Sequence, residues 1–534
     1  MGEIRVFGFP LLRSYVITGF RYTEISKIKN KNTIPFYQRE TMKKYLKEYW
    51  PYLLALLPVM LLRDFSPASE LRYVSLATEL INGNHLFCLT WQGEEFPYIM
   101  PLYVWLIALL KLVFGHHFMI TITLLFSFIP SIIILAIMNR WVEKYDAQSF
   151  RLKDGSQSRM LASIMLFTCG MQLAMSFFVS PDMLFSLWIV AALYTFWRLI
   201  MDQGSYGLSK DIKKRKHLQW RFGLYIFLAV FTKGPLGFII PFVSTTLFLL
   251  FSGRIRRWTS AWNWRGWIVF LGLLNIWLYL TYLEGGAAWI DKMMLESPLS
   301  MFLHPEHHNR PWYYYLLSLW ADTLPWGPIC IVVIVISLIR RIHHKEFLWN
   351  RFFGTPLQNF FAIIFAVSLV YFSAQKMKLD VNMLPAYPFL VYLGVMQLEQ
   401  WRWPVRLNWP MIWVCRIVLL IVFIGGLLCP WLNIKTCYGR ICYHANDLQR
   451  ELNTEKFYVY KVRRPKGMDV YLHEDPIEAT PEDIAEGKLQ NTLLIMKEYR
   501  LDRLKKNLDE LGVPAEKQGE VIDELGDYII VRFR

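Results

Sequence analysis

The stretch FTKGPLGFIIP, residues 231–241, interrupts one of the most apolar parts of the chain with a lysine and a Gly-Pro pair. A charged side chain inside a bilayer is costly, and a helix-breaking pair is tolerated there only where other groups satisfy the freed backbone. One interpretation is that Lys233 snorkels from a helix end beside a tight turn. The other is that Lys233 is a cation held at the water interface for an anionic ligand. The choice between them depends on the membrane topology.

The bulk composition is typical of an integral membrane protein. Hydrophobic residues make up 54% of the 534 residues, and the mean hydropathy is +0.28, which is too apolar for a soluble protein. The net charge of +16 could indicate nucleic-acid binding, but the 22 Trp and 37 Phe stand among long apolar runs. We therefore attribute the positive charge to basic cytoplasmic loops between membrane spans.

Eleven apolar runs are candidate membrane spans. Several are shorter than the ~20 residues of a full span, so their ends must extend into amphipathic flanks. The runs are 50–62, 118–138, 160–179, 183–201, 220–232, 235–251, 266–283, 325–339, 358–374, 383–398 and 411–434.

A further apolar run, 98–114, decides the orientation. If it crossed the membrane, the first two basic clusters of the chain would lie outside the cytoplasm. If it lies along the surface, all four clusters share one side with KKYLKEY at 43–49, as the positive-inside rule requires. The sequence therefore predicts a mainly α, polytopic membrane helix bundle of about 11 spans plus interfacial helices, with Lys233 at an external turn. The four clusters are 140–159, 209–221, 254–257 and 340–351.

The chain is expected to comprise three segments. Residues 42–434 form the transmembrane bundle, and MKKYLKEYW at Met42 resembles a natural start, so residues 1–41 are an N-terminal extension that need not be native. In residues 435–534, FYVYKV, MDVYLH, TLLIMK and YIIVRF are typical of strands, whereas TPEDIAE and LDRLKKNLDELG are typical of helices. This tail is predicted to be a small soluble extracytoplasmic α/β domain.

The cysteines and histidines of the sequence do not identify a metal site. Of the seven cysteines, only Cys437 and Cys442 lie near each other outside the apolar part. They could form a small disulfide loop in an oxidising compartment, and two free thiols are the equal alternative. The histidines of HPEHH, residues 304–308, match no familiar zinc spacing. The sequence leaves room for a divalent metal but assigns it no ligands.

The predicted external segments bring a small set of ionisable residues to the apolar boundary. Two carboxylates and several cations there are typical of a site for an anionic lipid head group, because cations bind phosphate and a carboxylate orients or deprotonates an acceptor. For each residue the alternative is a solvated or snorkelling anchor at a span end. The set is Glu70, Arg72, Asp182, Lys233, His307, His308, Arg310, Lys376 and Lys378.

Six motifs follow one another in a specific order. They are an acidic-x-Arg-Tyr segment after the first span, PLYVW, a lone Asp before the fourth span, TKGP, PWYYY, and a Lys-x-Lys segment before a late span. This order, over about residues 42–400, resembles the lipid A aminoarabinose transferase and protein O-mannosyltransferase superfamily. Those GT-C-type membrane glycosyltransferases take a sugar from a polyprenyl-phosphate donor. The resemblance implies an inside N-terminus and interfacial helices in the first external loop.

The resemblance and the external charges together define the candidate site. Glu70 and Asp182 are the expected catalytic residues. The expected ligands of the substrate or the lipid phosphate are Arg72, Tyr73, Tyr103, Lys233, His307, His308, Arg310, Tyr313, Lys376 and Lys378.

Three positions depart from the family pattern. Ser69 stands where the first acid of the family's pair is expected, Ile99 replaces its phosphate-contacting lysine, and Asn382 replaces a tyrosine. These departures imply a changed donor or acceptor, a Glu70 that has taken over from the lost acid, or a divergent relative with little activity.

The favoured function is an inverting hexosyl or pentosyl transferase. It would move a sugar from a polyprenyl-phosphate donor to a lipid A-like or glycan acceptor, on the periplasmic face of the bacterial cytoplasmic membrane. The alternatives are a non-catalytic relative and a transporter or flippase of anionic lipids. A transporter would be expected to contain internal repeats and broken helices at the membrane midplane, and no repeat is visible in the sequence.

Overall fold

The structure is a computed structural model. It describes residues 36–67, 69–83, 85–91, 93–115, 118–146, 155–202, 209–303, 308–345, 352–401, 408–462, 465–514 and 517–533. The chain divides into two compact units, 1–53 and 54–534. The extension predicted over 1–41 lies almost entirely outside the described residues. The described part of the first unit is helical and belongs to α2 (Phe36–Leu62).

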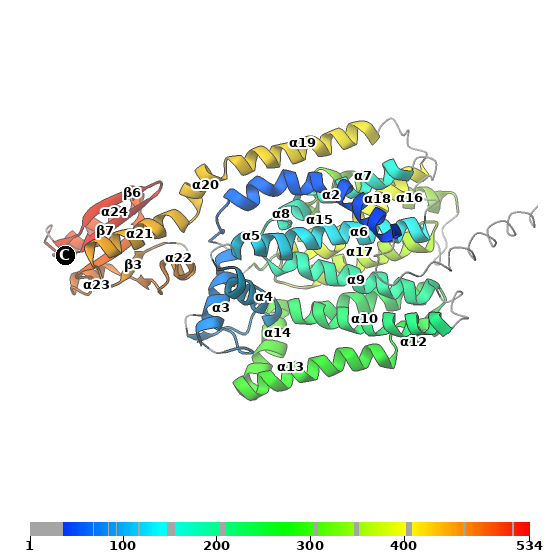
Figure 1. Cartoon of the computed structure of the whole chain (residues 1–534), viewed down its shortest axis with the longest axis horizontal. Helices are drawn as coiled ribbons and strands as arrows, with labels where there is room; N and C mark the ends of the chain where they lie inside the picture. Colours follow the sequence, from blue (N-terminus) through cyan, green and yellow to red (C-terminus); the bar gives the residue numbers. More distant parts are fainter. Residues whose placement is uncertain are drawn as a thin grey trace, which may run out of the picture. The chain divides into compact units, whose positions relative to one another are not determined.

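Long helices build most of the second unit (Figure 1). A helix satisfies every backbone hydrogen bond within its own segment, which is why apolar sequences of this length fold as helices in lipid. The long helices are α5 (Phe118–Ile122) continued by a π-helical stretch (Thr123–Phe128) and α6 (Ile129–Tyr145), α7 (Gly155–Phe167), α9 (Pro181–Met201), α10 (Ser209–Lys233), α11 (Leu236–Phe251), α13 (Trp264–Asp291), α16 (Trp326–His343), α17 (Pro356–Ala374), α18 (Tyr387–Gln400) and α19 (Asn408–Leu427).

Shorter elements join these helices. They are α3 (Glu70–Gly83), β1 (Thr90–Trp91), β2 (Glu94–Glu95), α4 (Pro101–Phe114), α8 (Gly170–Met175), the 3₁₀ turn Ile255–Arg257, α12 (Trp258–Ala261), the π-helical turn Lys292–Glu296, α14 (Ser297–Leu303), α15 (Tyr314–Asp322), the 3₁₀ helix Asp380–Ala386 and α20 (Cys429–Thr436).

Seven helical stretches among the described residues are long and apolar enough to cross a membrane. The protein is therefore a polytopic membrane helix bundle, as predicted, while the number of eleven spans stays a prediction. The seven are Met119–Tyr145, Pro181–Met201, Trp264–Leu303, Trp326–His343, Pro356–Ala374, Asp380–Gln400 and Asn408–Leu427, and shorter apolar helices cover Tyr49–Leu62, Pro101–Phe114 and Leu236–Phe251.

The bundle has a protein-buried centre and a lipid-facing periphery. In the apolar windows of α9 and of Asp380–Gln400, 89% and 94% of the residues are buried, against 22% in α13 and α19. The indole of Trp141 on α6 lies in the centre, fully buried among the rings of Trp197, Phe361 and Phe389. Because α9 and α18 are enclosed by other helices, groups at their ends are shielded from lipid.

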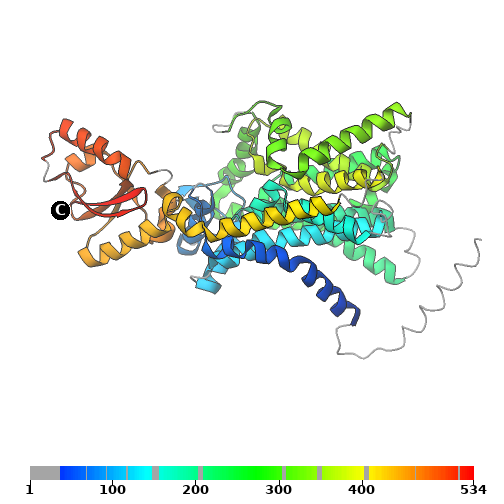
Figure 2. The ribbon, with the colours of Figure 1, turned by 90° about the horizontal axis from the view of Figure 1, so that it is seen from above.

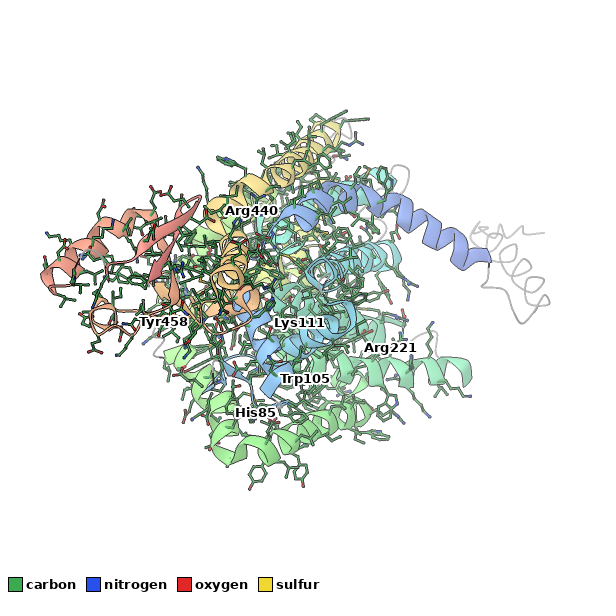
Figure 3. The ribbon with its side chains drawn as sticks, turned by 60° about the vertical axis from the view of Figure 1, so that its left-hand side comes forward. His85, Trp105, Lys111, Arg221, Arg440 and Tyr458 are labelled. Atoms are coloured by element: carbon green, nitrogen blue, oxygen red, sulfur yellow. The ribbon has the colours of Figure 1, made fainter. Side chains whose placement is uncertain are left out.

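The run 98–114 has the length of a surface helix. Its helix, α4, has 14 residues, or about 21 Å, short of the ~30 Å hydrocarbon core. Two views place α4 beside α3 at one end of the bundle (Figures 1 and 2). Lys111 Nζ donates to Thr78 Oγ1 on α3 at 2.6 Å, and Trp105 Nε1 donates to the Leu86 carbonyl at 2.6 Å. Figure 3 labels the two donors, Lys111 and Trp105. Length and packing fit the predicted interfacial helix.

The predicted span 160–179 is wrong as a continuous helix. Helix α7 ends at Phe167, and α8 covers only Gly170–Met175. The break lets the chain pack on a distant turn: Gly170 N donates to the Leu324 carbonyl at 2.8 Å, and Trp326 Nε1 donates to Thr168 Oγ1 at 2.8 Å. A Cβ at position 170 would lie 3.1 Å from the Asp322 carbonyl oxygen, so this close approach favours glycine.

The C-terminal segment contains the expected small α/β domain. Its five-stranded sheet has the order β4-β3-β5-β7-β6, with β3 parallel to β4 and β5, and β7 antiparallel to β5 and β6. The elements are α21 (Gly439–Leu452), β3 (Phe457–Tyr460), the 3₁₀ turn Pro465–Met468, α22 (Asp469–Leu472), β4 (Ile477–Glu478), α23 (Pro481–Ala485), β5 (Thr492–Lys497), the 3₁₀ turn Glu498–Arg500, α24 (Leu501–Glu510), β6 (Glu520–Leu525) and β7 (Tyr528–Phe533).

Most predicted elements of this domain are present. The capping box of Thr480 and Asp483 starts α23, and the apolar side of α24, with Leu504 and Leu508, packs into the core of the sheet. The strand predicted for MDVYLH is wrong, because these residues form a 3₁₀ turn followed by α22. Strands β4 and β6 were not predicted, since β4 has only two residues and acidic residues interrupt the apolar residues of β6.

Candidate functional site

The TKGP motif forms the predicted turn between two bundle helices. Helix α10 ends at Lys233 and α11 begins at Leu236. Gly234 has φ +73°, a backbone conformation that favours glycine, and its N–H donates to the Val230 carbonyl at 2.7 Å. The turn thus places Lys233 at the last helical position of α10, where its side chain reaches the end of the neighbouring helix α9.

Lys233 contacts two polar side chains from neighbouring elements. Its ammonium forms an ion pair with Asp182 and donates to Asn382 Oδ1 at 3.0 Å. Asp182 lies in the first turn of α9, after the N-cap Ser180, where the helix dipole favours a negative charge. The side chains of Lys233 and Asp182 are 21% and 9% exposed. Lys233 therefore faces a carboxylate inside the protein, and the interpretation as a lipid-facing snorkelling residue is not supported.

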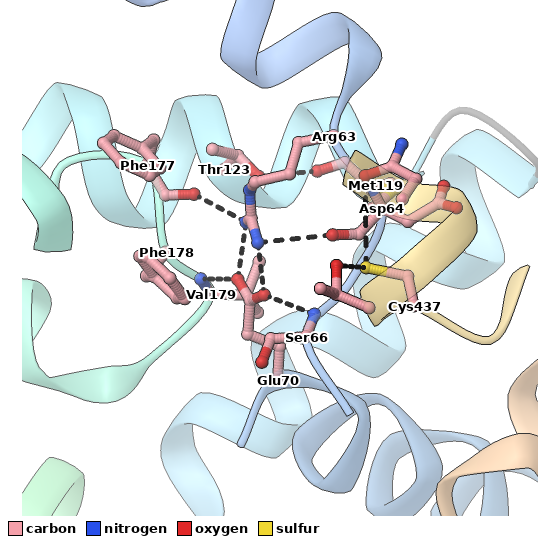
Figure 4. A network of polar contacts seen from close by, with 12 residues as sticks. Arg63, Asp64, Ser66, Glu70, Met119, Thr123, Phe177, Phe178, Val179 and Cys437 are labelled. Atoms are coloured by element: carbon pink, nitrogen blue, oxygen red, sulfur yellow. Dashed lines mark hydrogen bonds and ion pairs between the residues drawn. The ribbon is translucent and has the colours of Figure 1, made fainter. Parts of the chain in front are cut away.

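Glu70, the other expected carboxylate, is held in a separate ion pair. Arg63 Nη1 and Nη2 donate to its two oxygens at 2.5 and 2.7 Å (Figure 4). The backbone N–H groups of Ser66 and Val179 donate to the same oxygens at 2.7 and 2.6 Å. Glu70 is 0% exposed. Each carboxylate oxygen accepts two hydrogen bonds, so the carboxylate is saturated, and Arg63 rather than Lys233 is the cation that holds it.

The role of Arg63 was missed by sequence reasoning. It directly follows the first apolar run, where a basic residue usually indicates a snorkelling anchor. Here it also donates to the Phe177 carbonyl at 3.0 Å, and its guanidinium lies 4.7 Å from the ring centre of Phe178. The signal available in the sequence was an arginine at a predicted external span end, seven residues before a glutamate.

Two tyrosines lie near both carboxylates. The rings of Tyr73 on α3 and Tyr103 on α4 pack edge to face with centres 5.5 Å apart. Burial, with the charge of Asp182 adding to it, raises the pKa of Tyr73 to about 12. Burial, with added effects from Tyr73, Glu70 and Asp182, raises the pKa of Tyr103 well above its ordinary value. The Tyr103 hydroxyl is buried and has no hydrogen-bond partner among the described residues. It is thus a neutral donor with spare capacity.

The loop after α17 brings a second lysine to this end of the bundle. Lys378 is 2% exposed, and its ammonium donates to the carbonyls of Ser373, at 3.0 Å, and Gln375. Burial lowers the pKa of Lys378. The residues that follow Lys378 place Asn382 within hydrogen-bond distance of Lys233. Among the described residues, no hydrogen bond or ion pair joins Lys378 to Lys233, so the shared site expected for the two lysines stays a prediction.

The remaining expected ligands lie on an exposed segment paired with this loop. Residues 308–310 run antiparallel to 376–378, with Asn309 opposite Met377. The pairing uses backbone atoms, for example Lys378 N to the His308 carbonyl at 3.1 Å and Arg310 N to the Lys376 carbonyl at 3.2 Å. The side chains of His308, Arg310, Tyr313 and Lys376 are exposed. His307 lies outside the described residues. Arg72 is half-buried beside the Tyr73 ring.

Neither a disulfide nor a metal ligand set is seen among the described residues. Cys437 and Cys442 are both free and buried, so the alternative of two free thiols describes them. Within the ranges that the structure covers, no group of three His, Cys, Asp or Glu side chains could hold a metal ion. Residues 304–307 of HPEHH fall outside those ranges.

Relatives named undecaprenyl phosphate-alpha-4-amino-4-deoxy-L-arabinose arabinosyl transferase are similar to this chain in sequence. The protein of Pseudomonas paraeruginosa is 21% identical over 330 residues, covering 61% of this chain and 54% of the relative. That of Shewanella sediminis is 23% identical over 336 residues, covering 62% and 55%. The chain thus spans little more than half the length of these relatives. No protein-family model matches it.

Solved structures share the fold. ArnT from Cupriavidus metallidurans bound to undecaprenyl phosphate superposes with a TM-score of 0.66 at 13% identity, covering 92% of this chain and 98% of that one. The apo oligosaccharyltransferase of Archaeoglobus fulgidus gives 0.51 at 12% identity, covering 91% and 75%. The chain therefore shares its fold with these two membrane proteins, as the resemblance implied.

Proposed function

We propose that this protein is a membrane glycosyltransferase that moves a sugar from a polyprenyl-phosphate donor to a lipid A-like or glycan acceptor. The observation that carries the proposal is the ion pair of Lys233 and Asp182, which is partly exposed at one end of a GT-C bundle. The similarity to arabinosyl transferases that use undecaprenyl phosphate supports the donor class. Such an enzyme would be a multi-pass protein of the bacterial cytoplasmic membrane, with its site and C-terminal domain on the periplasmic side.

The two lysines would bind the donor phosphate. An ammonium has three N–H donors, and the contacts of Lys233 with Asp182 and Asn382 use two of them. Lys378 likewise uses two donors on backbone carbonyls. Each lysine retains one donor for a phosphate oxygen. The negative charge on the leaving lipid phosphate grows as the sugar departs, so preformed donors stabilise the transition state more than the ground state.

The two carboxylates would have different roles. Asp182 has spare acceptor capacity and would orient or deprotonate the acceptor hydroxyl. Glu70 is saturated by four donors, which favours a positioning role over that of a base. Its contact with Val179 holds the loop that leads into Asp182, and its contact with Ser66 holds the segment before α3. The Tyr103 hydroxyl, neutral at physiological pH, would donate a hydrogen bond to the donor phosphate or to the sugar.

The test is a transfer assay with the full chain reconstituted in liposomes. A labelled polyprenyl-phosphate aminoarabinose is the donor, and purified lipid A is the acceptor. We expect label to move to lipid A at a rate proportional to protein. Retention of all label on the donor, with a set of alternative sugars and with glycan acceptors as well, would overturn the proposal.

A further inference from the structure

A second cationic site lies in the C-terminal domain. An open hollow of about 310 Å³ is lined by five residues. They are Tyr460 at the end of β3, Lys461, Tyr499 and Arg500 in the 3₁₀ turn before α24, and Arg503 in the first turn of α24. Three of these five residues are cations, and none of the described residues that line the hollow is acidic. A volume of this size accommodates a small ligand, and a hollow whose charged residues are all cations favours an anion.

One of the three cations, Arg500, is held in place by hydrogen bonds within the domain. Arg500 Nε donates to Tyr499 Oη at 3.0 Å, and Arg500 Nη1 donates to the Lys461 carbonyl. Lys461 has φ +49°, a left-handed conformation that non-glycine residues rarely adopt. The strand therefore ends in a strained residue whose carbonyl anchors the guanidinium. Nη2 of Arg500 and the side chain of Arg503 make no hydrogen bond or ion pair among the described residues, which leaves them for a ligand.

The two tyrosines add aromatic surface to the cationic lining of the hollow. Tyr499 is 69% exposed and lies with its ring centre 5.3 Å from the Arg500 guanidinium carbon. Tyr460 is 1% exposed, and its hydroxyl has no hydrogen-bond partner among the residues that the structure describes. An exposed ring beside the fixed guanidinium of Arg500 suits a sugar that carries a phosphate. The sugar stacks on the ring, and the phosphate accepts hydrogen bonds from the arginine donors.

We propose that this hollow binds a phosphorylated sugar of a glycan. The assignment of that glycan to the acceptor rests on the proposed function and deepens it: the acceptor would be a phosphate-bearing glycan, gripped by the C-terminal domain while its reacting end lies at the bundle. A free sugar phosphate offers the same chemistry, so the experiment has to separate the two sources.

The first arm of the experiment measures binding to the full chain in detergent by isothermal titration. The probes are glucose 1-phosphate, glucose and inorganic phosphate. The test variant is Arg500→Gln with Arg503→Gln. The control is Lys505→Gln with Lys506→Gln, which removes two positive charges from the same helix at exposed positions that do not line the hollow.

We expect glucose 1-phosphate to bind, with a Kd at least 10-fold higher in the arginine variant and unchanged in the control. Glucose should not bind. An equal loss of affinity in both variants would show a bulk charge effect and would overturn the proposed site. Unchanged affinity in both variants would also overturn it. If inorganic phosphate binds as tightly as glucose 1-phosphate, the claim that the hollow recognises the sugar is overturned.

The second arm measures transfer to a phosphorylated acceptor and to its dephosphorylated form. For a glycan acceptor, the arginine variant should raise KM for the phosphorylated acceptor about 10-fold, leave kcat unchanged, and have no effect on the dephosphorylated acceptor. Binding in the first arm with no change of KM here would identify a soluble ligand and overturn the link to the acceptor. If the wild-type chain transfers no sugar at all, the proposed function fails, whereas the first arm still decides the site.

Discussion

The two ion pairs at this end of the bundle, Arg63–Glu70 and Lys233–Asp182, differ in how completely their carboxylates are occupied. Glu70 accepts four hydrogen bonds at 2.5–2.7 Å and is 0% exposed. Asp182 accepts one side-chain contact on each oxygen, from Lys233 and from Ser180 at 3.0 Å. The side chain of Lys233 is 21% exposed.

This difference separates an ion pair with a structural role from an ion pair that can bind a ligand. We call Arg63–Glu70 the closed pair and Lys233–Asp182 the open pair. The Arg63–Glu70 pair links the end of α2, the start of α3 and the loop 177–179 (Figure 4), and it has no acceptor capacity left for a ligand. The Lys233–Asp182 pair joins α10 to α9 while both partners keep spare hydrogen-bonding capacity. We therefore expect substitutions in the first pair to change mainly stability and those in the second to change mainly transfer.

Arg63→Met should have the largest effect, on folding. It leaves the Glu70 carboxylate buried without its cation, and breaking a buried pair in this way costs about 3–5 kcal/mol. Thermal unfolding in detergent is the measurement. The double variant Arg63→Met with Glu70→Gln should recover part of the loss, because no buried charge remains. Unchanged melting temperatures for Arg63→Met would remove the structural role assigned to this pair.

Lys233→Met should have the next largest effect, on transfer. Loss of one preorganised donor to a developing charge typically lowers kcat about 10²–10³-fold, while the melting temperature should fall less than in Arg63→Met because the open pair can rehydrate. Lys435→Met, at an exposed position on α20, is the matched control and should transfer normally. A Lys233→Met protein that transfers at the wild-type rate would restore the interpretation of Lys233 as a simple anchor.

Asn382→Ala should have a smaller effect on the same step. The substitution removes the hydrogen bond that orients Lys233, and a hydrogen bond of about 1 kcal/mol corresponds to roughly a 5-fold change in kcat/KM. The control Asn275→Ala removes an exposed asparagine whose side chain donates within its own helix, to the Leu271 carbonyl at 2.7 Å. If Asn382→Ala matched Lys233→Met in its loss of transfer, Asn382 would contact the substrate itself, and its role in orienting Lys233 would be secondary.

The open pair could be predicted from the sequence, whereas the closed pair could not. Lys233 stands out because a charge beside Gly-Pro is unusual in an apolar run, and Asp182 stands out as a lone acid before a span. Arg63 resembles an ordinary anchor, and its contact with Glu70 forms only when residues 63–69 turn back and meet the loop 177–179. Such a contact depends on tertiary structure, which hydropathy does not encode.

The other failures of prediction have the same origin. The break at Gly170 is set by Leu324, 154 residues away, although the run itself is apolar enough to span. The residues of MDVYLH alternate like a strand, but Asp469 accepts a hydrogen bond from Ser75 Oγ on α3 at 2.5 Å, which places the segment outside the sheet. Local patterns predicted the bundle, the surface helices and the turn, because these follow from periodicity and charge along one segment.

Asp469 extends the comparison to a carboxylate that has no cation in contact among the described residues. Ser75 Oγ donates to Asp469 Oδ2, and Trp91 Nε1 donates to Ser75 Oγ at 3.1 Å. The Oδ1 atom is buried without a partner among those residues. The charged groups that act on it are Asp475 and Lys111. Mainly through burial, the pKa of Asp469 is raised to about 6, so the folded protein favours the protonated carboxyl.

Asp469→Asn should therefore have the smallest effect, visible only as a change in pH dependence. Because the folded-state pKa of about 6 exceeds the unfolded value of about 3.9, the folded wild type binds more protons between these two pH values. Its stability thus falls as pH rises through this window, and stays lower above it. The amide has no such titration, so the variant should show a flatter profile of melting temperature against pH, with a difference of about 1–2 °C across the window.

Melting curves of both proteins from pH 4 to 8 are the measurement, and Glu478→Gln, an exposed acid on β4, is the control. A wild-type stability that rises from pH 4 to 6 by a contribution absent in Asp469→Asn would show that Asp469 is stabilised as a carboxylate, by a cation like Glu70, and would place it with the closed pair.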